Sequence, residues 1–370
     1  MGDKTELITS SEFQQELRKR GGLSVSRCFQ CATCSSVCQL APAEAPFPRR
    51  QMLWAQWGLT ERLMTDPGVW LCHQCNDCNT RCPRDAKPGD VMQTIRSLAI
   101  ERLAVPGFMG RLVGRAATTW PLLIGIPFLF WIVALYAVNG LEPPASPLVY
   151  DHFVPHWLIY IVYFTTTGLV SLATLASGLR FWNMLGKGAQ RSGSFISSLI
   201  GVLIEIAVHK RFAKCETNAS RRLGHFMLLW GFVGAALASG LIIVALYIMH
   251  EEMPLAFLHP FKIVGNIAAV LLVAGGVAVL LNRLQPDQRA GAPTAYDNFF
   301  LSVVLLVIAS GVLTELGRYF LDPLIACWIY IIHLSAVLSL FATFPYSKFA
   351  HMLYRTLAMV HERMTTSQNK

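Results

Sequence analysis

The chain has 370 residues, of which 54% are hydrophobic and only 14% are charged. It is too apolar for an ordinary soluble protein and long enough for two domains. The net charge of +9 does not indicate a nucleic-acid partner, because the basic residues concentrate beside apolar runs, where positive-inside membrane topology explains them. We therefore predict a soluble head over residues 1–110 and a membrane domain over residues 111–370.

The first twenty residues are polar and charged, without the apolar stretch of a secretory signal. We therefore expect the head to remain in the cytoplasm. Helical patterns follow one another along the head, so each cysteine cluster is expected in a loop between helices. The expected helices cover residues 5–20, 48–57 and 89–103, with a shorter one around Glu61.

Eight of the ten cysteines form two runs with the spacing C-x-x-C-x-x-C-x-x-x-C. In a reducing compartment such runs indicate metal ligands rather than disulfides. Three thiolates on a tight loop bind three corners of a cubane, and the fourth reaches the other cluster. Zinc is the alternative, but a zinc site needs four ligands and does not require two identical runs. The sequence predicts two [4Fe-4S] clusters, one held by Cys28, Cys31, Cys34 and Cys82 and the other by Cys72, Cys75, Cys78 and Cys38.

Six apolar stretches reach the length of about 20 residues that a membrane-spanning helix needs. The connection 180–222 and the segment after residue 344 are rich in Lys and Arg, whereas the connections 139–153 and 250–257 contain none. The positive-inside rule therefore predicts that both termini lie in the cytoplasm. The expected spans are residues 119–138, 154–179, 223–249, 258–281, 298–320 and 323–344.

A seventh apolar stretch, residues 195–208, is shorter than a span requires. We expect it to lie at the membrane interface or to pack on the bundle. If it crossed the membrane, every later segment would invert and the basic C-terminal segment would lie outside, contrary to the charge rule.

Histidines at membrane depth are costly and mark functional sites, although a single histidine at a helix end is also common at the interface, where we expect His209. His225 opens the third expected span and His351 follows the sixth, both on the head side. Facing imidazoles at similar depth suit a bis-histidine haem b. His333 lies eighteen residues before His351, so on a continuous helix the two would share a face about 27 Å apart. One helix would then offer ligands to two haems.

A second haem would need a partner for His333 in the outer half of the membrane. His156, near the outer end of the second span, is the first choice, and His259, at the start of the fourth, is the second. Quinone chemistry also moves protons, and Glu315 is an intramembrane acid near the outer end of the fifth span. The alternative for Glu315 is an ion pair with Arg318, one turn later.

The head resembles the C subunit of heterodisulfide reductase in three motifs. These are R-C-F-x-C-x-x-C over residues 27–34, V-W-L-C over residues 69–72 and R-C-P-R over residues 81–84. The resemblance implies an α-helical ferredoxin domain with two [4Fe-4S] clusters.

The segment 333–354, with F-P-Y-S-K between its two histidines, resembles the last span of the cytochrome b subunit of respiratory nitrate reductase. That family binds two haems b and oxidises quinol. In the family the partner of the histidine equivalent to His351 falls at His225. The family's second histidine, ten residues further along the same helix, is Ala235 in this chain.

The fusion of such a head to such a membrane domain resembles the C subunit of the quinone-interacting membrane-bound oxidoreductase (Qmo) complexes. The resemblance implies an all-α protein of the cytoplasmic (inner) membrane, with a six-helix cytochrome b-like bundle. Its implied partners are soluble flavin and iron–sulfur subunits, the quinone pool and, in dissimilatory sulfur metabolism, adenylylsulfate reductase. The alternatives are the membrane subunit of another heterodisulfide-reductase-like or sulfite-reduction-associated complex, and a redox-sensing membrane anchor.

Overall fold

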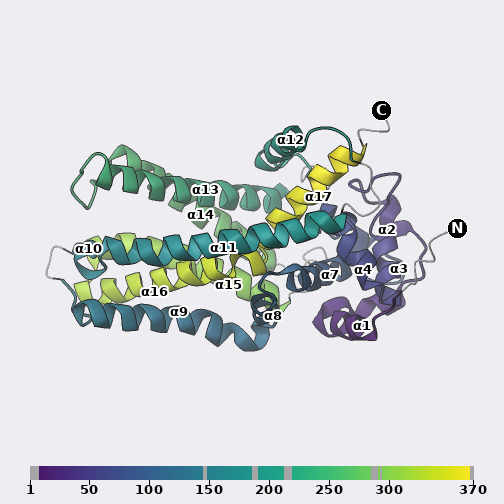
Figure 1. Cartoon of the computed structure of the whole chain (residues 1–370), viewed down its shortest axis with the longest axis horizontal. Coiled ribbons are helices and arrows are strands. Elements are labelled where there is room, and N and C mark those ends of the chain that lie inside the picture. Colours follow the sequence, from purple (N-terminus) through teal and green to yellow (C-terminus); the bar gives the residue numbers. More distant parts are fainter. Residues whose placement is uncertain are drawn as a thin grey trace.

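Helices and connecting loops account for all the residues that the computed structural model describes, which are 8–144, 148–185, 191–211, 219–284, 291 and 294–366. Short helices form the head, and long apolar helices extend from it side by side (Figure 1). This arrangement confirms the predicted all-α fold class.

The head consists of short helices around two cysteine-containing loops. The first helix begins at Ser11 because the Ser10 side chain caps it, accepting a hydrogen bond from Phe13 N at 3.1 Å. The third ends at Gly58, whose φ of +67° is the left-handed conformation that favours glycine. The elements are α1 (Ser11–Leu17), η1 (Arg18–Gly22), η2 (Leu23–Arg27), α2 (Thr33–Ser36), α3 (Arg49–Trp57), α4 (Thr60–Thr65), α5 (Gly68–Leu71), α6 (Asp77–Thr80) and α7 (Pro88–Leu103).

Six helices of the second part are long and apolar enough to cross a membrane, in agreement with the six expected spans. Two of them approach closely through small residues: a Cβ added at Gly275 would lie 2.9 Å from the carbonyl oxygen of Gly224. The six are α9 (Ala116–Asn139), α11 (His156–Leu185), α13 (Ala219–Tyr247), α14 (Pro260–Leu284), α15 (Ala295–Phe320) and α16 (Pro323–Thr343). The shorter α8 (Gly107–Gly114) joins the head to α9, and α10 (Tyr150–Phe153) precedes α11.

The last expected span does not continue as one straight helix to His351. After α16 the chain forms a 3₁₀ turn, η5 (Phe344–Tyr346), and then α17 (Ala350–Thr366). Pro345 lies inside that turn and cannot donate a helical hydrogen bond. The expectation that His333 and His351 share one helix face is therefore wrong, and α17 diverges from the line of α16 (Figure 1).

The short apolar stretch forms α12 (Phe195–Ala207), which packs on α17. Its polar anchor is Glu205, which accepts hydrogen bonds from Arg211 Nε at 2.7 Å and Arg363 Nη2 at 2.8 Å. The opposite side of the helix presents Ile196 and Leu203 to the surface. An amphipathic helix of this kind suits a membrane interface.

The head and the long helices share one hydrophobic core. Trp70 of α5 lies 4.7 Å from Tyr354 of α17 and 5.8 Å from Phe181 of α11, measured between ring centroids. All three side chains are fully buried. Because α17 comes from the C-terminal end of the chain, the head is held by helices from both sides of the predicted boundary at residue 110.

Candidate functional site: two cysteine loops above a membrane cavity

The two cysteine loops have the same backbone conformation. Gln30 and Ala32 of the first loop have φ values of 61° and 70°, and the equivalent Gln74 and Asn76 have values of 53° and 65°. Left-handed backbone is uncommon for residues with side chains, so its repetition at matching positions marks a shared functional geometry. Each loop then ends in one short helix, α2 or α6.

The first loop gathers three of its own cysteines with the last cysteine of the second run. Burial, together with the neighbouring Cys28, Cys31 and Cys82, raises the pKa of the Cys34 thiol to about 11. Burial also raises the pKa of Cys28, and Cys82 adds to that effect. Cys82 therefore lies beside the first run.

The second loop gathers its own cysteines with Cys38. Burial, together with the neighbouring Cys72 and Cys75, raises the pKa of the Cys38 thiol to about 11. Burial likewise raises the pKa of Cys78, and Cys72, Cys75 and Cys38 contribute to the increase. Each run thus extends its fourth cysteine toward the other.

Hydrogen bonds reach sulfur atoms in both groups. The backbone N–H of Gln74 donates to Cys72 Sγ at 3.4 Å, and that of Ala86 donates to Cys82 Sγ at 3.3 Å. Hydrogen bonds of this kind raise the reduction potential of a cluster held by the same sulfurs.

A cavity of about 1340 Å³ lies between the head and the long helices. Apolar side chains of α11, α13 and α16 form its walls, and the second cysteine loop and α7 close it on the head side with His73, Gln74, Gln93 and Arg96. Burial lowers the pKa of His73, and the nearby Arg355 and Arg96 lower it further, so this imidazole is neutral at pH 7. Nε and Nη2 of Arg96 are buried and have no hydrogen-bond partner among the described residues.

The cavity brings together His225 of α13 and His351 of α17, as the sequence predicted from their position beside the head. Their ring centroids lie 6.3 Å apart. In each ring Nδ1 is already engaged: that of His351 with the carbonyl oxygen of Lys348, and that of His225 with Nε2 of His209 at 2.9 Å. Both rings line the cavity and are oriented by these hydrogen bonds at Nδ1.

His209 was expected at the interface, but its side chain is buried against His225. It follows α12 in a turn with φ of 53°. No sequence pattern links His209 to His225, because the contact depends on how α12 packs on α17.

Arg355 connects the membrane part to the second cysteine loop. It lies one turn after His351 on α17 and donates hydrogen bonds to the carbonyl oxygens of Trp70 at 3.0 Å and Cys72 at 2.5 Å. One helix therefore carries a cavity histidine and, four residues later, a contact to the backbone of a cluster cysteine.

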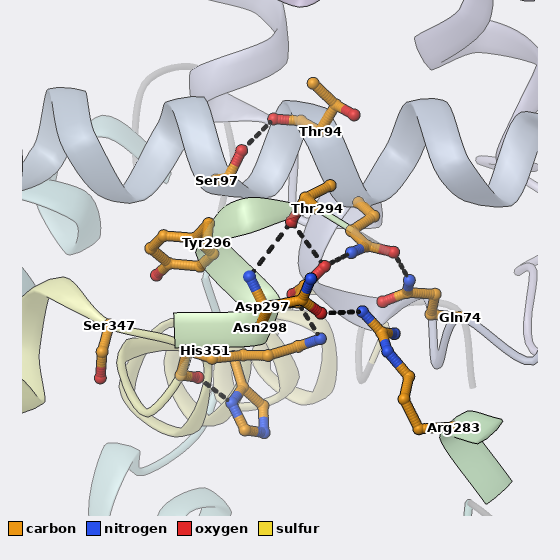
Figure 2. Close-up of polar contacts among 12 residues, drawn as sticks. Gln74, Thr94, Ser97, Arg283, Thr294, Tyr296, Asp297, Asn298, Ser347 and His351 are labelled. Atoms are coloured by element: carbon orange, nitrogen blue, oxygen red, sulfur yellow. Dashed lines mark hydrogen bonds and ion pairs between the residues drawn. The ribbon is translucent and has the colours of Figure 1, made fainter. Parts of the chain in front are cut away.

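A polar chain runs along the same junction (Figure 2). Gln74 of the second cysteine loop donates to Gln93 of α7, and Gln93 donates to Asp297 of α15. Lys348 Nζ donates to the other carboxylate oxygen of Asp297 at 2.8 Å, and the carbonyl oxygen of Lys348 bonds His351. The chain connects the second cysteine loop to a cavity histidine through side chains that the sequence alone did not single out.

The residues predicted for the outer half of the membrane lie outside the lining of this cavity. Nδ1 of His333 bonds Ser310 Oγ at 3.1 Å, and His156 stacks on Tyr160 with centroids 6.2 Å apart. Glu315 pairs with Lys262 of α14 at 2.6 Å. The alternative pairing of Glu315 with Arg318 is wrong, because the neighbouring helix supplies a closer cation.

Comparison with known proteins assigns both parts of the chain. Residues 24–86 match the 4Fe-4S dicluster domain, and residues 134–370 match the family model for citrate utilization protein B. Citrate utilization protein B of Escherichia coli is 24% identical over 361 residues, covering 90% of this chain and 88% of that protein. No solved structure matches the chain.

The head is also similar to the C subunit of heterodisulfide reductases. The C subunit of the H(2):CoB-CoM heterodisulfide,ferredoxin reductase of Methanothermobacter thermautotrophicus is 37% identical over 99 residues, covering 26% of this chain. A C-subunit-like heterodisulfide reductase protein of Archaeoglobus profundus is 29% identical over 106 residues, covering 28% of this chain. The chain spans 51% and 56% of these two relatives, about half of their length. The head is therefore an iron–sulfur electron-transfer domain of the kind found in an oxidoreductase subunit.

Proposed function

Because the chain belongs to the citrate utilization protein B family and carries an iron–sulfur dicluster domain, we propose that it transfers electrons between the membrane quinone pool and soluble flavin-containing partner subunits. The carriers are haem b and two [4Fe-4S] clusters. The observation that supports this most directly is the cavity itself, where two histidines lie beneath the loop that contributes Cys72.

The cavity residues fit a bis-histidine haem. Two imidazoles bonded at about 2 Å to opposite sides of one metal ion have centroids roughly 6 Å apart, close to the 6.3 Å between His225 and His351. A hydrogen bond at Nδ1 orients each ring, as is usual for a histidine that binds a metal through its other nitrogen. The buried, unpartnered nitrogens of Arg96 suit an acidic side group of a haem. When bound, haem supplies a one-electron carrier at this position.

The cysteine geometry supports the crossed ligand sets. Cys28, Cys31 and Cys34 with Cys82 would hold one cluster, and Cys72, Cys75 and Cys78 with Cys38 the other. The second set lies beside the cavity, because Arg355 bonds the Cys72 carbonyl and His73 lines the cavity wall. Electrons then pass from the cavity to the second cluster, next to the first, and from there to the partner, or in the reverse order.

The partner subunits admit two proposals. The head motifs and the fusion to a membrane domain support a Qmo-type complex of dissimilatory sulfur metabolism, with adenylylsulfate reductase as the eventual partner. The similarity to citrate utilization protein B over 90% of the chain favours instead a partner flavoprotein connected with citrate utilisation. Purifying the native complex and identifying its soluble subunits by mass spectrometry separates the two.

The orientation of the chain is also testable. Lys370 lies outside the described residues. A reporter that works only in the cytoplasm should be active when fused after Lys370, because the basic loops remain on that side of the membrane. The same reporter fused in the connection 250–257, which contains no Lys or Arg, should be inactive, because this connection is expected on the outer side of the membrane. The reverse pattern would contradict the proposed orientation.

His209 gives a prediction that does not depend on turnover. Replacing it by Ala removes the hydrogen bond to His225 Nδ1, and loss of such a partner lowers metal affinity by about 10- to 100-fold. We expect weaker haem retention and a shifted midpoint potential, with clusters unchanged by EPR. His209→Gln, which retains a hydrogen-bonding group, should restore part of the affinity. Unchanged haem affinity and potential in His209→Ala would exclude this role.

A further inference from the structure

The cavity is larger than a single ligand site requires. Pockets for one cofactor or drug-sized ligand measure about 300–1,000 Å³, whereas this cavity measures about 1340 Å³. Its lining includes His225 and His351 and, beyond them, Asp297 at the N-terminal end of α15. The volume leaves room for a second molecule next to the pair of histidines.

The walls of the cavity suit a lipid-soluble molecule. Leu175 of α11 and Val233 of α13 line it, and both side chains are largely exposed. These two helices have the composition of membrane spans, so an apolar molecule from the bilayer would meet an apolar boundary between them. The charged groups and the glutamines of the lining gather toward the head, whereas α11 contributes the hydroxyl groups of Thr167, Ser171 and Thr174 along the apolar wall.

Asp297 is the acidic residue of this lining, and it is buried, with 5% of its surface exposed. One oxygen accepts from Lys348, and the other accepts from Gln93 and from Thr294 Oγ1 at 2.7 Å. Thr294 also caps α15, so one of these contacts has a structural role. An ionised carboxylate has about four acceptor sites, so one remains beyond the three in use.

A buried acid within a span is a functional site by default, because its charge is costly there unless it is paired. The Lys348 ion pair lowers that cost, and Gln93 connects the carboxylate to the loop of the second cysteine run. Asp297 therefore combines a proton-binding group with a hydrogen-bonded connection, through Gln93 and Gln74, to the second cysteine loop.

We propose that the head end of this cavity binds the ring of a quinone, with Asp297 and Lys348 as the groups that contact its oxygens. This deepens the proposed function and rests on it. Reduction of the quinone takes up two electrons, delivered singly by the carriers, and two protons, and it forms an O–H bond at each ring oxygen. Asp297 passes one proton to the nearer oxygen, the Lys348 ammonium donates the other, and both groups recover their protons from the head side. Oxidation of quinol reverses every step.

This site differs from the one that the sequence suggested. Glu315 lies eighteen residues after Asp297 on the same helix, about 27 Å along its axis. Glu315 is held by Lys262 and does not line the cavity. The two acids therefore form a matched pair of test positions at opposite ends of α15, only one of which adjoins the cavity.

The test uses the full chain with its clusters and haem, titrated with the fluorescent quinone analogue 2-heptyl-4-hydroxyquinoline N-oxide. Asp297→Asn should weaken binding at least about tenfold, the scale expected for a lost charged hydrogen bond. Asp297→Glu should retain part of the affinity, and Glu315→Gln should bind like the unmodified protein. The proposal would be overturned if Glu315→Gln bound the analogue more weakly while Asp297→Asn bound it as tightly as the unmodified protein.

A second measurement needs no variant and so does not depend on the folding of Asp297→Asn. Photolabelling of the unmodified protein with an azidoquinone should mark peptides within residues 291–305 or 340–353. Labelling confined to residues 310–325 would overturn this site while leaving quinone function intact. If neither probe binds the unmodified protein, both this site and the proposed quinone function are wrong.

Discussion

Replacing either His225 or His351 by Ala should abolish the same low-spin b-type haem signal. His225 and His351 would each supply one bond to the haem iron, so either substitution would leave the haem with a single protein ligand or would leave it unbound. Both rings line the same cavity, with centroids 6.3 Å apart, so the two variants should have the same reduced-minus-oxidised spectrum. His333→Ala is the matched control: His333 does not line the cavity, and its loss should leave this signal in place.

The same variants test the electron route. Quinol should reduce the clusters at least about tenfold more slowly without this haem, because the cavity is the connection between the long helices and the second cysteine loop. Dithionite should still reduce the clusters, because their thiolate ligands are untouched. Loss of different haems in His225→Ala and His351→Ala would contradict the pairing, and an unchanged rate would contradict the route.

Replacing the fourth cysteine of either run by Ser should damage the cluster that the other run mainly holds. Cys38→Ser removes a thiolate that lies beside Cys72 and Cys75, and Cys82→Ser removes one beside Cys28 and Cys34. In the EPR spectrum of Cys38→Ser, the signal of the cluster next to the cavity should therefore be lost or broadened. In Cys82→Ser, the signal of the other cluster should be lost or broadened.

Haem content controls for a general loss of structure in these variants. The cavity histidines are on other elements, so both cysteine variants should keep the b-type spectrum. If each variant instead lost the cluster held by the run that contains the substitution, the crossed ligand sets would be wrong. Each cluster would then be held by the four cysteines of a single run.

The features that the sequence predicted well are local ones. The cysteine runs determine their own loops through spacing, and the six apolar helices follow from the length of their apolar stretches. His225 and His351 were identifiable because each lies at the head end of a span, so depth alone suggested that they meet. Pro345, which cannot donate a helical hydrogen bond, was also present in the sequence, but we did not predict the break between α16 and α17 from it.

The contacts that the sequence did not predict join residues far apart in the chain. His209 meets His225 only because α12 folds back on α17. Lys262 of α14 pairs with Glu315 of the neighbouring α15. Asp297 looks like an ordinary helix-capping residue until Lys348 and Gln93 are seen on its other sides. Patterns of period 2 or 3.6 carry no information about such pairs.

The most direct test of the central claim is a dithionite-reduced-minus-oxidised spectrum of the purified full chain, with iron and haem counted per chain. An electron route through the cavity predicts b-type bands, at least one haem per chain and the iron of two four-iron clusters. A spectrum without b-type bands, in a preparation that retains its cluster iron, would contradict the haem route. It would favour a membrane anchor whose clusters sense redox state without passing electrons to quinone.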